Sequence, residues 1–410
     1  MEHVPLLIVG AGPFGLSLAT HARRHDIEYL MVGRPMHFWQ ANMPQGMLLR
    51  SACDWHLDPA DVDTIEAYLA TMGKTPADVE PLRLDFYLGY TRWFQDKQHC
   101  RIRSDLVTRL DETDGRFVAT MAAGEPITAD TVVLALGFHA FAHTPHDIAA
   151  MLPPGRYGHT CDVVDLASFR GKRCLIIGGR QSAFEWTALL HEHGAASVDM
   201  CYRHDTPAFT EADWSWFNQQ VDRMVDNPSW FRSLTDEEKA AVNGRFWTEG
   251  RLKLEPWLGP RIAHDTVHLW PHTEVVGCAL DPADDAEGVL RITLSNEETV
   301  TVDHVIFATG YKVDMSRVPL LAAGNLLPRL VVDNGYPCLD EHFETNIPGL
   351  FITSMPAVQD FGLFFAFTIS VRTSARLIVP AVQRRIAAPT SVEAPTDSGV
   401  PSERRQHISP

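Results

Sequence analysis

The stretch Leu6-Leu7-Ile8-Val9-Gly10-Ala11-Gly12-Pro13-Phe14-Gly15 decides the fold of this 410-residue chain. Its first four residues form an apolar run of strand length, the glycines follow at once, and residues 16–24 continue with the pattern of a helix. Gly10 permits a tight turn, Gly12 lets the backbone approach a pyrophosphate, and Gly15 lets helix and strand pack closely. We therefore predict a phosphate-binding loop over residues 10–15, Pro13 and Phe14 included, at the N-terminus of a helix.

Residues 27–32 are the next apolar run and predict a second buried strand, which completes a β-α-β unit. An acid is expected at the end of this strand to bind a ribose hydroxyl, but Gly33 stands at that position. Arg34 follows directly, and we assign it to a contact with adenine or phosphate.

The same succession returns later in the chain. An apolar run at 174–177 precedes Gly178-Gly179-Arg180-Gln181-Ser182-Ala183, a helix through His191 and a strand at 198–202. Arg180 replaces the middle glycine, so its side chain either crowds the pyrophosphate or reaches over it as a cation. Arg203 stands where an arginine can bind the 2′-phosphate that separates NADPH from NADH, or is simply solvated. We predict an α/β protein with two Rossmann-like dinucleotide-binding domains, although the second could keep its fold without its ligand.

The remaining segments complete this organisation. Asp114-Gly115 predicts a hairpin turn within 111–120, and buried strands at 132–136 and 305–310 return the chain to the nucleotide sites. We assign 1–150 and 311–386 to the first domain, and 151–310 to the second. A tryptophan-rich helical insertion is expected at 206–260, where the indoles fill the core or line a pocket. Residues 387–410 lack an apolar period and predict a disordered tail.

Composition excludes several classes of function. The formal net charge of −17 repels phosphate backbones and anionic lipid, so neither nucleic acid nor a membrane is an expected partner. The seven cysteines include no C-x-x-C pair and no metal-ligand spacing, so we expect reduced thiols and no metal. The N-terminal segment lacks the basic flank of a signal peptide, and the longest later apolar run is too short to span a bilayer. A cytoplasmic protein is the expectation.

Three further motifs show a family resemblance. Gly155-Arg156-Tyr157-Gly158-His159 matches the core of a linker fingerprint, and Asp303-His304-Val305-Ile306-Phe307-Ala308-Thr309-Gly310-Tyr311 matches a second signature in full. The stretch from Trp39 to Ser51 is similar to the flavin-proximal segment of ornithine and lysine hydroxylases. With the two glycine loops, these motifs make the chain resemble the class B flavin monooxygenases, which include N-hydroxylating, sulfur-oxidising and Baeyer–Villiger enzymes.

The resemblance implies both cofactors and a set of site residues. In this family NADPH reduces FAD, oxygen adds to the reduced flavin, and the resulting flavin hydroperoxide oxygenates a small substrate. It places the first glycine loop on FAD and the second, with Gln181 and Ser182, on NADPH. His159 would hold the linker, and Asp54 and Trp55 would face the substrate. Arg50 and Ser51 are the residues assigned to catalysis, and the remaining cofactor contacts are Trp39, Met47, Thr309, Gly310, Tyr311, Phe361 and Gly362.

Among the reactions of the family we favour N-oxygenation of a small amine, because the segment from Trp39 resembles the amine hydroxylases most. S-oxidation and Baeyer–Villiger insertion stay open, as do nicotinamide preference and homo-oligomerisation. The alternative of another class is a nucleotide-sensing flavoprotein without turnover. A flavin disulfide reductase would need a redox-active cysteine pair, and the Trp214-Ser215-Trp216 string departs from the halogenase motif in the residues that follow.

Overall fold

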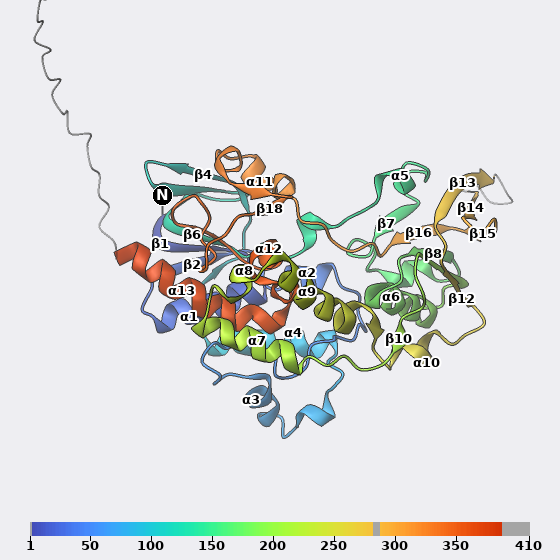
Figure 1. Ribbon diagram of the computed structural model, residues 1–410, viewed down its shortest axis with the longest axis horizontal. Coiled ribbons are helices and arrows are strands. Elements are labelled where there is room, and N and C mark those ends of the chain that lie inside the picture. Colours follow the sequence, from blue (N-terminus) through green and yellow to red (C-terminus); the bar gives the residue numbers. More distant parts are fainter. Residues whose placement is uncertain (1, 282–287, 388–410) are drawn as a thin grey trace, which may run out of the picture.

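The computed structural model describes residues 2–281 and 288–387, which form two lobes (Figure 1). The left lobe of Figure 1 is built on a seven-stranded sheet, and the right lobe on a five-stranded sheet beside a smaller antiparallel one. Each larger sheet contains a parallel β-α-β unit in which one of the two glycine loops connects the first strand to the helix. The predicted α/β class with two Rossmann-like units is confirmed.

The first sheet has the strand order β3-β2-β1-β6-β5-β4, and β19 pairs with the end of β6. Five of these strands run parallel, while β4 and β5 form an antiparallel hairpin on β6. The last four residues of β1 and all of β2 are buried, as expected for parallel strands covered on both faces. The strands are β1 (Glu2–Val9), β2 (Tyr29–Val32), β3 (Ile102–Arg103), β4 (Val107–Thr113), β5 (Arg116–Met121), β6 (Ile127–Leu134) and β19 (Leu350–Ile352).

Local signals placed the elements of this lobe well. The predicted hairpin turn is confirmed, since Asp114 and Gly115 both have positive φ (54° and 75°), the geometry of a type I′ turn. Helix α1 (Pro13–Arg24) begins three residues earlier than predicted, because proline is suited to the first helical position. The strand predicted from residue 27 begins at Tyr29, and the one predicted over 132–136 ends at Leu134.

The second lobe holds a parallel sheet in the order β12-β9-β8-β16-β7. Strand β16 ends at Phe307, so the predicted strand at 305–310 stops three residues early and leaves residues 308–310 in a loop. A three-stranded antiparallel meander, β13-β14-β15, contributes the core under this sheet. The strands are β7 (Tyr157–His159), β8 (Arg173–Ile177), β9 (Ser197–Tyr202), β12 (Val267–Pro271), β13 (Val275–Asp281), β14 (Val289–Leu294), β15 (Thr299–Val302) and β16 (His304–Phe307).

The tryptophan-rich segment is helical and joins the lobes. Its longest helix, α9 (Asp236–Arg251), begins with a Thr235 capping box and runs from the first lobe toward the second in Figure 1. Its other elements are α7 (Ser215–Asp226), α8 (Trp230–Ser233), α10 (Leu258–Ile262) and the short pair β10 (Ala208–Phe209) and β11 (Lys253–Leu254). Most of its aromatic residues pack on the core of the first lobe, whereas Leu258 and Ile262 pack on α6 (Gln181–Glu192).

The C-terminal part of the described chain returns to the first lobe. Helix α13 (Val371–Ala387) packs along α1, and Ser17 of α1 donates a hydrogen bond to the Val371 carbonyl. Ala387 is the last residue of this helix, so the predicted tail starts one residue too early, and its residues 388–410 lie outside the described part. The other helices are α2 (His37–Ala41), α3 (Ile65–Ala70), α4 (Leu84–Lys97), α5 (His146–Ala149), α11 (Pro319–Ala322) and α12 (Val358–Phe361). The short pair β17 (Val332–Asp333) and β18 (Tyr336–Pro337) completes the set of strands.

A buried carboxylate fixes the long loop between α2 and α3. Asp58 is 0% exposed, accepts hydrogen bonds from the Arg24 guanidinium of α1, and accepts three more from loop backbone amides. Asp61 on the same loop pairs with Arg372 and Arg376 of α13. The loop is thus held against both helices, and with it residues 50–55.

The Asp58 contacts predict a specific acid sensitivity. Burial raises the pKa of Asp58, but the Arg24 guanidinium and backbone donors outweigh it and hold that pKa at about 2. A lowered folded-state pKa stabilises the fold above about pH 4, and this stability is lost as the pH falls toward 2. We expect Asp58→Asn to lower the free energy of unfolding at neutral pH by about 2 kcal/mol, because the contacts that hold the carboxylate pKa low are lost. The unfolding midpoint should fall accordingly. The variant should also lose stability less steeply between pH 4 and 2.

Thermal unfolding followed by circular dichroism measures both effects. The matched control is Asp85→Asn, which breaks an exposed ion pair with Arg83 and should change stability by about 1 kcal/mol or less. Equal behaviour of the two variants would contradict the role assigned to Asp58.

Candidate functional site

The first glycine loop leaves open space where a ligand would approach. A Cβ on Gly10 would lie 2.2 Å from the Ala135 carbonyl oxygen, and one on Gly15 would lie 1.9 Å from the Gly10 carbonyl oxygen. A Cβ on Gly12 would meet nothing within 4 Å. Helix α1 starts beyond Gly12 with no side-chain cap, so its first amides are free of a side-chain acceptor. The loop has the tight packing and open mouth that a dinucleotide diphosphate requires.

The structure explains the missing acid after β2. Gly33 has φ +152°, and a Cβ there would lie 2.8 Å from the Ala11 backbone nitrogen. An acidic side chain at this position would collide with the glycine loop itself. Arg34, the next residue, is exposed beside the loop.

The second glycine loop packs as tightly as the first. A Cβ on Gly178 would lie 2.5 Å from the Ala308 carbonyl oxygen, and one on Gly179 would lie 2.5 Å from the Tyr202 ring. Arg180 is the N-cap residue of α6, but its side chain extends away from the helix. Its Nη1 donates to the Arg251 carbonyl oxygen at 3.1 Å, and its guanidinium lies 5.5 Å from the Trp247 ring centroid. The Arg180 side chain therefore packs against the insertion.

Two candidate residues near this loop remain accessible. Ser182 is exposed in the first turn of α6. Arg203, just beyond β9, has a side chain that is 81% exposed and lies 3.6 Å from Glu274. Both side chains are free to meet a ligand at the carboxyl end of the second sheet.

His159 links the two chain segments that run between the lobes. Its Nε2 donates to the Gly310 carbonyl oxygen at 3.0 Å, and its Nδ1 accepts from the Cys161 amide at 3.2 Å. Thr309 donates its hydroxyl to the His143 carbonyl oxygen, and the Tyr311 ring packs edge-on against His159. Burial lowers the pKa of His159, which favours the neutral ring this geometry needs. These residues tie the carboxyl end of β16 to the segment that follows β7.

The two residues assigned to catalysis, Arg50 and Ser51, both form hydrogen bonds within the protein. Arg50 donates from Nε to Glu255 at 2.6 Å and from its terminal nitrogens to the Gly250 and Glu249 carbonyl oxygens, at 2.6 and 3.3 Å. Ser51 shares a hydrogen bond of 3.1 Å with Thr368. The two terminal nitrogens of Arg50 are therefore directed at the end of α9, and Nε is directed at Glu255 beyond it. We describe Arg50 as a tether of the insertion.

The substrate candidates also meet the insertion. Asn218 of α7 donates to the Asp54 carboxylate at 2.8 Å and accepts from the Trp55 indole at 3.0 Å. Trp55 is only 5% exposed and packs edge-on against Trp214, so its ring has little surface left for a substrate. Asp54 stays exposed.

The predicted cap at Phe361 is wrong as a side-chain contact. Phe361 is 0% exposed and stacks on Phe343 with ring centroids 3.8 Å apart and planes 5° from parallel. Its ring is part of the core, and Gly362 beside it has φ 94° and forms the turn after α12. No surface of the Phe361 ring is available to a cofactor.

Trp39 and Met47 lie on different sides of the same segment. Met47 packs on the core of the second lobe, and the neighbouring Leu48 amide donates to Glu185 of α6 at 3.2 Å. Glu185 is completely buried; burial raises its pKa, and the Arg261 guanidinium at 2.8 Å opposes that rise. This contact holds residues 46–48 against the second lobe.

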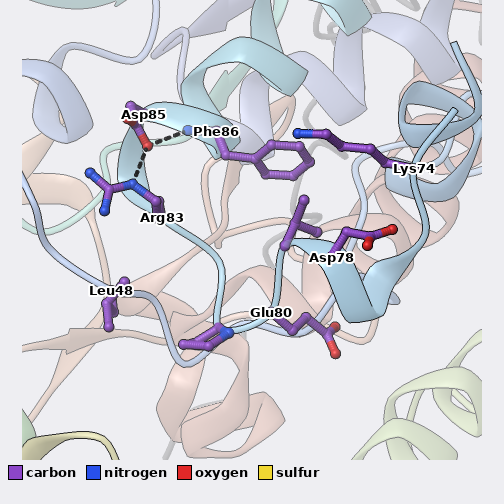
Figure 2. Close-up of a pocket in the computed structure, with 9 residues that line it drawn as sticks. Leu48, Lys74, Asp78, Glu80, Arg83, Asp85 and Phe86 are labelled. Atoms are coloured by element: carbon purple, nitrogen blue, oxygen red, sulfur yellow. Dashed lines mark hydrogen bonds and ion pairs between the residues drawn. The ribbon is translucent and has the colours of Figure 1, made fainter. Parts of the chain in front are cut away.

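Trp39 lines a recess of about 590 Å³ between the 39–46 segment and α4. A neighbouring depression of about 610 Å³, drawn in Figure 2, shares Arg83 and Asp85 with it. The residues that line this depression carry both signs of charge, since Lys74 and Arg83 lie on its wall together with Asp78 and Glu80. Neither recess was foreseen, because their walls come from loops whose meeting no local pattern signals.

One group in the described part of the chain has metal-ligand chemistry. The ligand atoms of His139, Cys161 and Asp162 lie within 4.8 Å of one another. Burial raises the pKa of the Cys161 thiol to about 12, and its sulfur lies 3.1 Å from Nδ1 of His159. A thiol held in this protonated form is a poor metal ligand.

The family of this chain follows from its first 244 residues. Residues 7–244, which contain both glycine loops, match the family described as pyridine nucleotide-disulphide oxidoreductase. The chain belongs to this family. All seven of its cysteines lie in the described part and are free, so the family's disulfide chemistry has no cysteine pair here.

Similar proteins within and around this family include oxygenases and reductases. The chain is 30% identical to a FAD-dependent urate hydroxylase of Xanthomonas campestris over 124 residues, and 29% identical to a trimethylamine monooxygenase of Pelagibacter ubique over 113 residues. Each match covers 28% of this chain and 26% of the relative. A ferredoxin–NADP reductase of Paraburkholderia phymatum is 27% identical over 221 residues, which cover 52% of this chain and 55% of the relative. The matches thus span between a quarter and just over half of these relatives.

Solved structures agree on the fold over nearly the whole chain. An ornithine N-hydroxylase of Kutzneria sp. 744 superposes with a TM-score of 0.75 at 18% identity, covering 94% of this chain and all of the other. A bacillithiol disulfide reductase of Staphylococcus aureus gives a TM-score of 0.64, also at 18% identity, over 94% of this chain and 99% of the other. The predicted resemblance to the N-hydroxylating flavin monooxygenases is confirmed at the level of the fold. None of the helices in the described part has the length and apolar character that crossing a bilayer requires.

The open space at Gly12 generates a prediction. We expect Gly12→Ala to fold normally, because its Cβ meets no protein atom, but to weaken retention of a bound dinucleotide by blocking the approach of the diphosphate. Flavin retained after gel filtration, together with the unfolding midpoint, measures the two effects.

The matched control is Gly244→Ala in α9, whose added Cβ also meets nothing within 4 Å. It should keep its flavin and be as stable as the parent or slightly more stable, because alanine is the better helix former. Full retention of flavin in Gly12→Ala would contradict the assignment of the loop.

Proposed function

We propose that the protein is a monooxygenase that holds FAD on the first lobe and NADPH on the second, and oxygenates a small molecule. The observation that carries the proposal is the pair of glycine loops, each opening a helix at the carboxyl end of a parallel sheet, in lobes whose two connecting segments are joined by the His159 contact. In doubly wound sheets, ligands bind at this end of the strands. The names of the urate hydroxylase, trimethylamine monooxygenase and ornithine N-hydroxylase relatives support oxygenation.

The residues present fit both cofactors. Gly12 and the first turn of α1 offer an uncapped, unobstructed seat for the FAD diphosphate. Around α6, Gly178 and Ala183 preserve the tight loop, while Ser182 and Arg203 remain accessible for a nicotinamide dinucleotide. FAD accepts a hydride from NADPH and passes the electrons to oxygen, so the hard chemistry belongs to the cofactor.

For this chemistry the protein itself must exclude water from the site and hold the two lobes in a fixed relative position. Between the lobes, Phe138 packs against Tyr311 and Phe367, with ring centroids 5.2 and 6.2 Å apart, and Phe246 packs on Phe367 from the insertion. Such an apolar wall limits the access of water to reactive groups. His159 and Glu185 fix the positions of the connecting segments on either side.

N-oxygenation of a small amine is the reaction we propose. One amine and one O₂ would be consumed with NADPH and a proton, giving the hydroxylamine or N-oxide, NADP⁺ and water. Two of the named relatives act on amines, trimethylamine and ornithine, by their descriptions. Asp54 is exposed and carries a negative charge that suits an ammonium group, which favours it as a substrate contact. We place the enzyme in the cytoplasm, where its seven thiols would stay reduced.

The proposal is tested with protein reconstituted with FAD. Under nitrogen, NADPH should bleach the visible flavin absorbance. On admission of air with an amine, mass spectrometry should find a product one oxygen atom heavier, and NADPH consumption should match product formation. The amine series should contain trimethylamine and ornithine, with a thioether and a ketone as comparisons.

Other outcomes identify other functions. Product from the thioether or the ketone alone would replace N-oxygenation with S-oxidation or Baeyer–Villiger insertion. NADPH oxidation that transfers electrons to added ferredoxin without oxygenated product would make the protein a reductase. Bound flavin that NADPH does not reduce would favour a nucleotide-sensing protein.

A further inference from the structure

Three arginines converge on the C-terminal end of α9. Arg180 and Arg251 lie with their guanidinium carbons 5.5 and 5.7 Å from the centroid of the Trp247 ring. Arg50 reaches the same end of the helix from the first lobe and lies over Trp214. The Trp247 ring is 44% exposed, so this cluster opens to solvent.

The positive charges of the cluster are not balanced. Arg50 is paired with Glu255 at 2.6 Å. Within residues 2–281 and 288–387, no carboxylate forms an ion pair with Arg180 or Arg251, and no hydrogen bond involves the Arg251 side chain. Burial, and then the Arg50 and Arg180 guanidiniums, lower the pKa of Arg251, which reports a site unfavourable for its charge. Two uncompensated cations stand together in a chain whose net charge is −17.

Helix capping explains only part of this arrangement. Arg50 and Arg180 donate to the last carbonyl oxygens of α9, as basic residues commonly do at a helix C-terminus. This role uses one nitrogen of Arg180 and none of the guanidinium nitrogens of Arg251. The remaining guanidinium N–H groups of Arg180 and Arg251, which lie beside the same Trp247 ring, are therefore available to bind a ligand.

A second, independent donor adjoins Arg180 in the sequence and contacts Glu255, the partner of Arg50. Gln181 is the first residue of α6, directly after Arg180, and its side-chain oxygen accepts from the Glu255 amide at 3.1 Å. Its Nε2 is buried and has no hydrogen-bond acceptor. A buried donor without an acceptor costs free energy that a bound anion would recover. The positive end of the α6 dipole lies at the same residue.

We propose that Arg180 and Arg251, supported on Trp247, form a seat for an oxyanion between the second sheet and the insertion. The position of Arg180 at the N-cap of α6, in the second glycine loop, favours a phosphate of the nicotinamide dinucleotide as occupant. That choice of occupant rests on the proposed function; a substrate carboxylate has the same chemistry. The arginine that interrupts the second glycine motif is then a ligand, and the insertion supplies its partner.

The test compares anion binding by the FAD-loaded parent protein with that of Arg251→Met. Inorganic pyrophosphate, NADPH and NADH are titrated by calorimetry under nitrogen, at constant ionic strength, into protein whose flavin has first been reduced with dithionite, so that no hydride is transferred. We expect Arg251→Met to weaken pyrophosphate and NADPH binding by about tenfold or more, since a charge-assisted hydrogen bond to phosphate is lost. Arg251→Lys, which keeps the charge, should recover part of the affinity and shows whether the loss follows charge rather than folding.

Arg245→Met is the matched control. Arg245 lies on the same helix and stacks on Trp216 at 4.4 Å, but outside the cluster, so this variant should bind every ligand as the parent does. A larger loss for NADPH than for NADH would place the 2′-phosphate in the seat, and equal losses would place the diphosphate there. Weaker pyrophosphate binding with unchanged dinucleotide binding would make a substrate carboxylate the occupant.

Unchanged affinity for all three ligands in Arg251→Met would overturn the seat. Pyrophosphate binding needs no electron transfer. If the protein binds pyrophosphate through Arg251 but never consumes NADPH, the oxyanion site is supported and the proposed function is contradicted.

Discussion

The fold depends on close contacts between backbone atoms at the two glycine loops. At Gly15, a carbonyl oxygen of the same loop lies 1.9 Å from the place where a Cβ would stand, and at Gly178 the Ala308 carbonyl oxygen, just after β16, does the same at 2.5 Å. Helix and strand can pack this closely only where no Cβ intervenes. The carboxyl edge of each sheet, and hence the position of both candidate cofactor sites, follows from that contact.

Hydrogen bonds between residues far apart in the sequence then position the lobes, the connecting segments and the insertion. Glu185 accepts from the Leu48 amide and joins the two lobes. His159 donates to Gly310 and joins the connecting segments, and Arg50 binds the end of α9 in the insertion. Each contact uses a charged or polar group whose removal from water is compensated by a well-placed partner. The insertion also helps to position the two lobes, because it contacts residues 50–55 on one side and α6 on the other.

The sequence allowed the fold to be predicted because its decisive signals are local. A strand, a glycine turn and a helix occupy adjacent residues, and the Asp114-Gly115 turn needs only two. The site was harder, because partners such as Arg50 and Glu255 stand 205 residues apart and no local pattern connects them. Trp55 and Phe361 were given ligand roles from motif similarity, yet both are buried in aromatic packing that only the folded chain assembles. Gly33 shows the reverse case, since its departure from the motif has a steric cause that the sequence could not reveal.

The division of the first sheet between the two ends of the chain has a consequence for synthesis. Strand β19 and helix α13, which cover β6 and α1, are made after every strand of the second lobe. On the ribosome, the second lobe, continuous from β7 to β16, can complete its sheet while the first still exposes apolar surface meant for α13. The first lobe therefore cannot complete its sheet until β19 has been synthesised, and a chain truncated before residue 350 would leave β6 without β19 and α1 without α13.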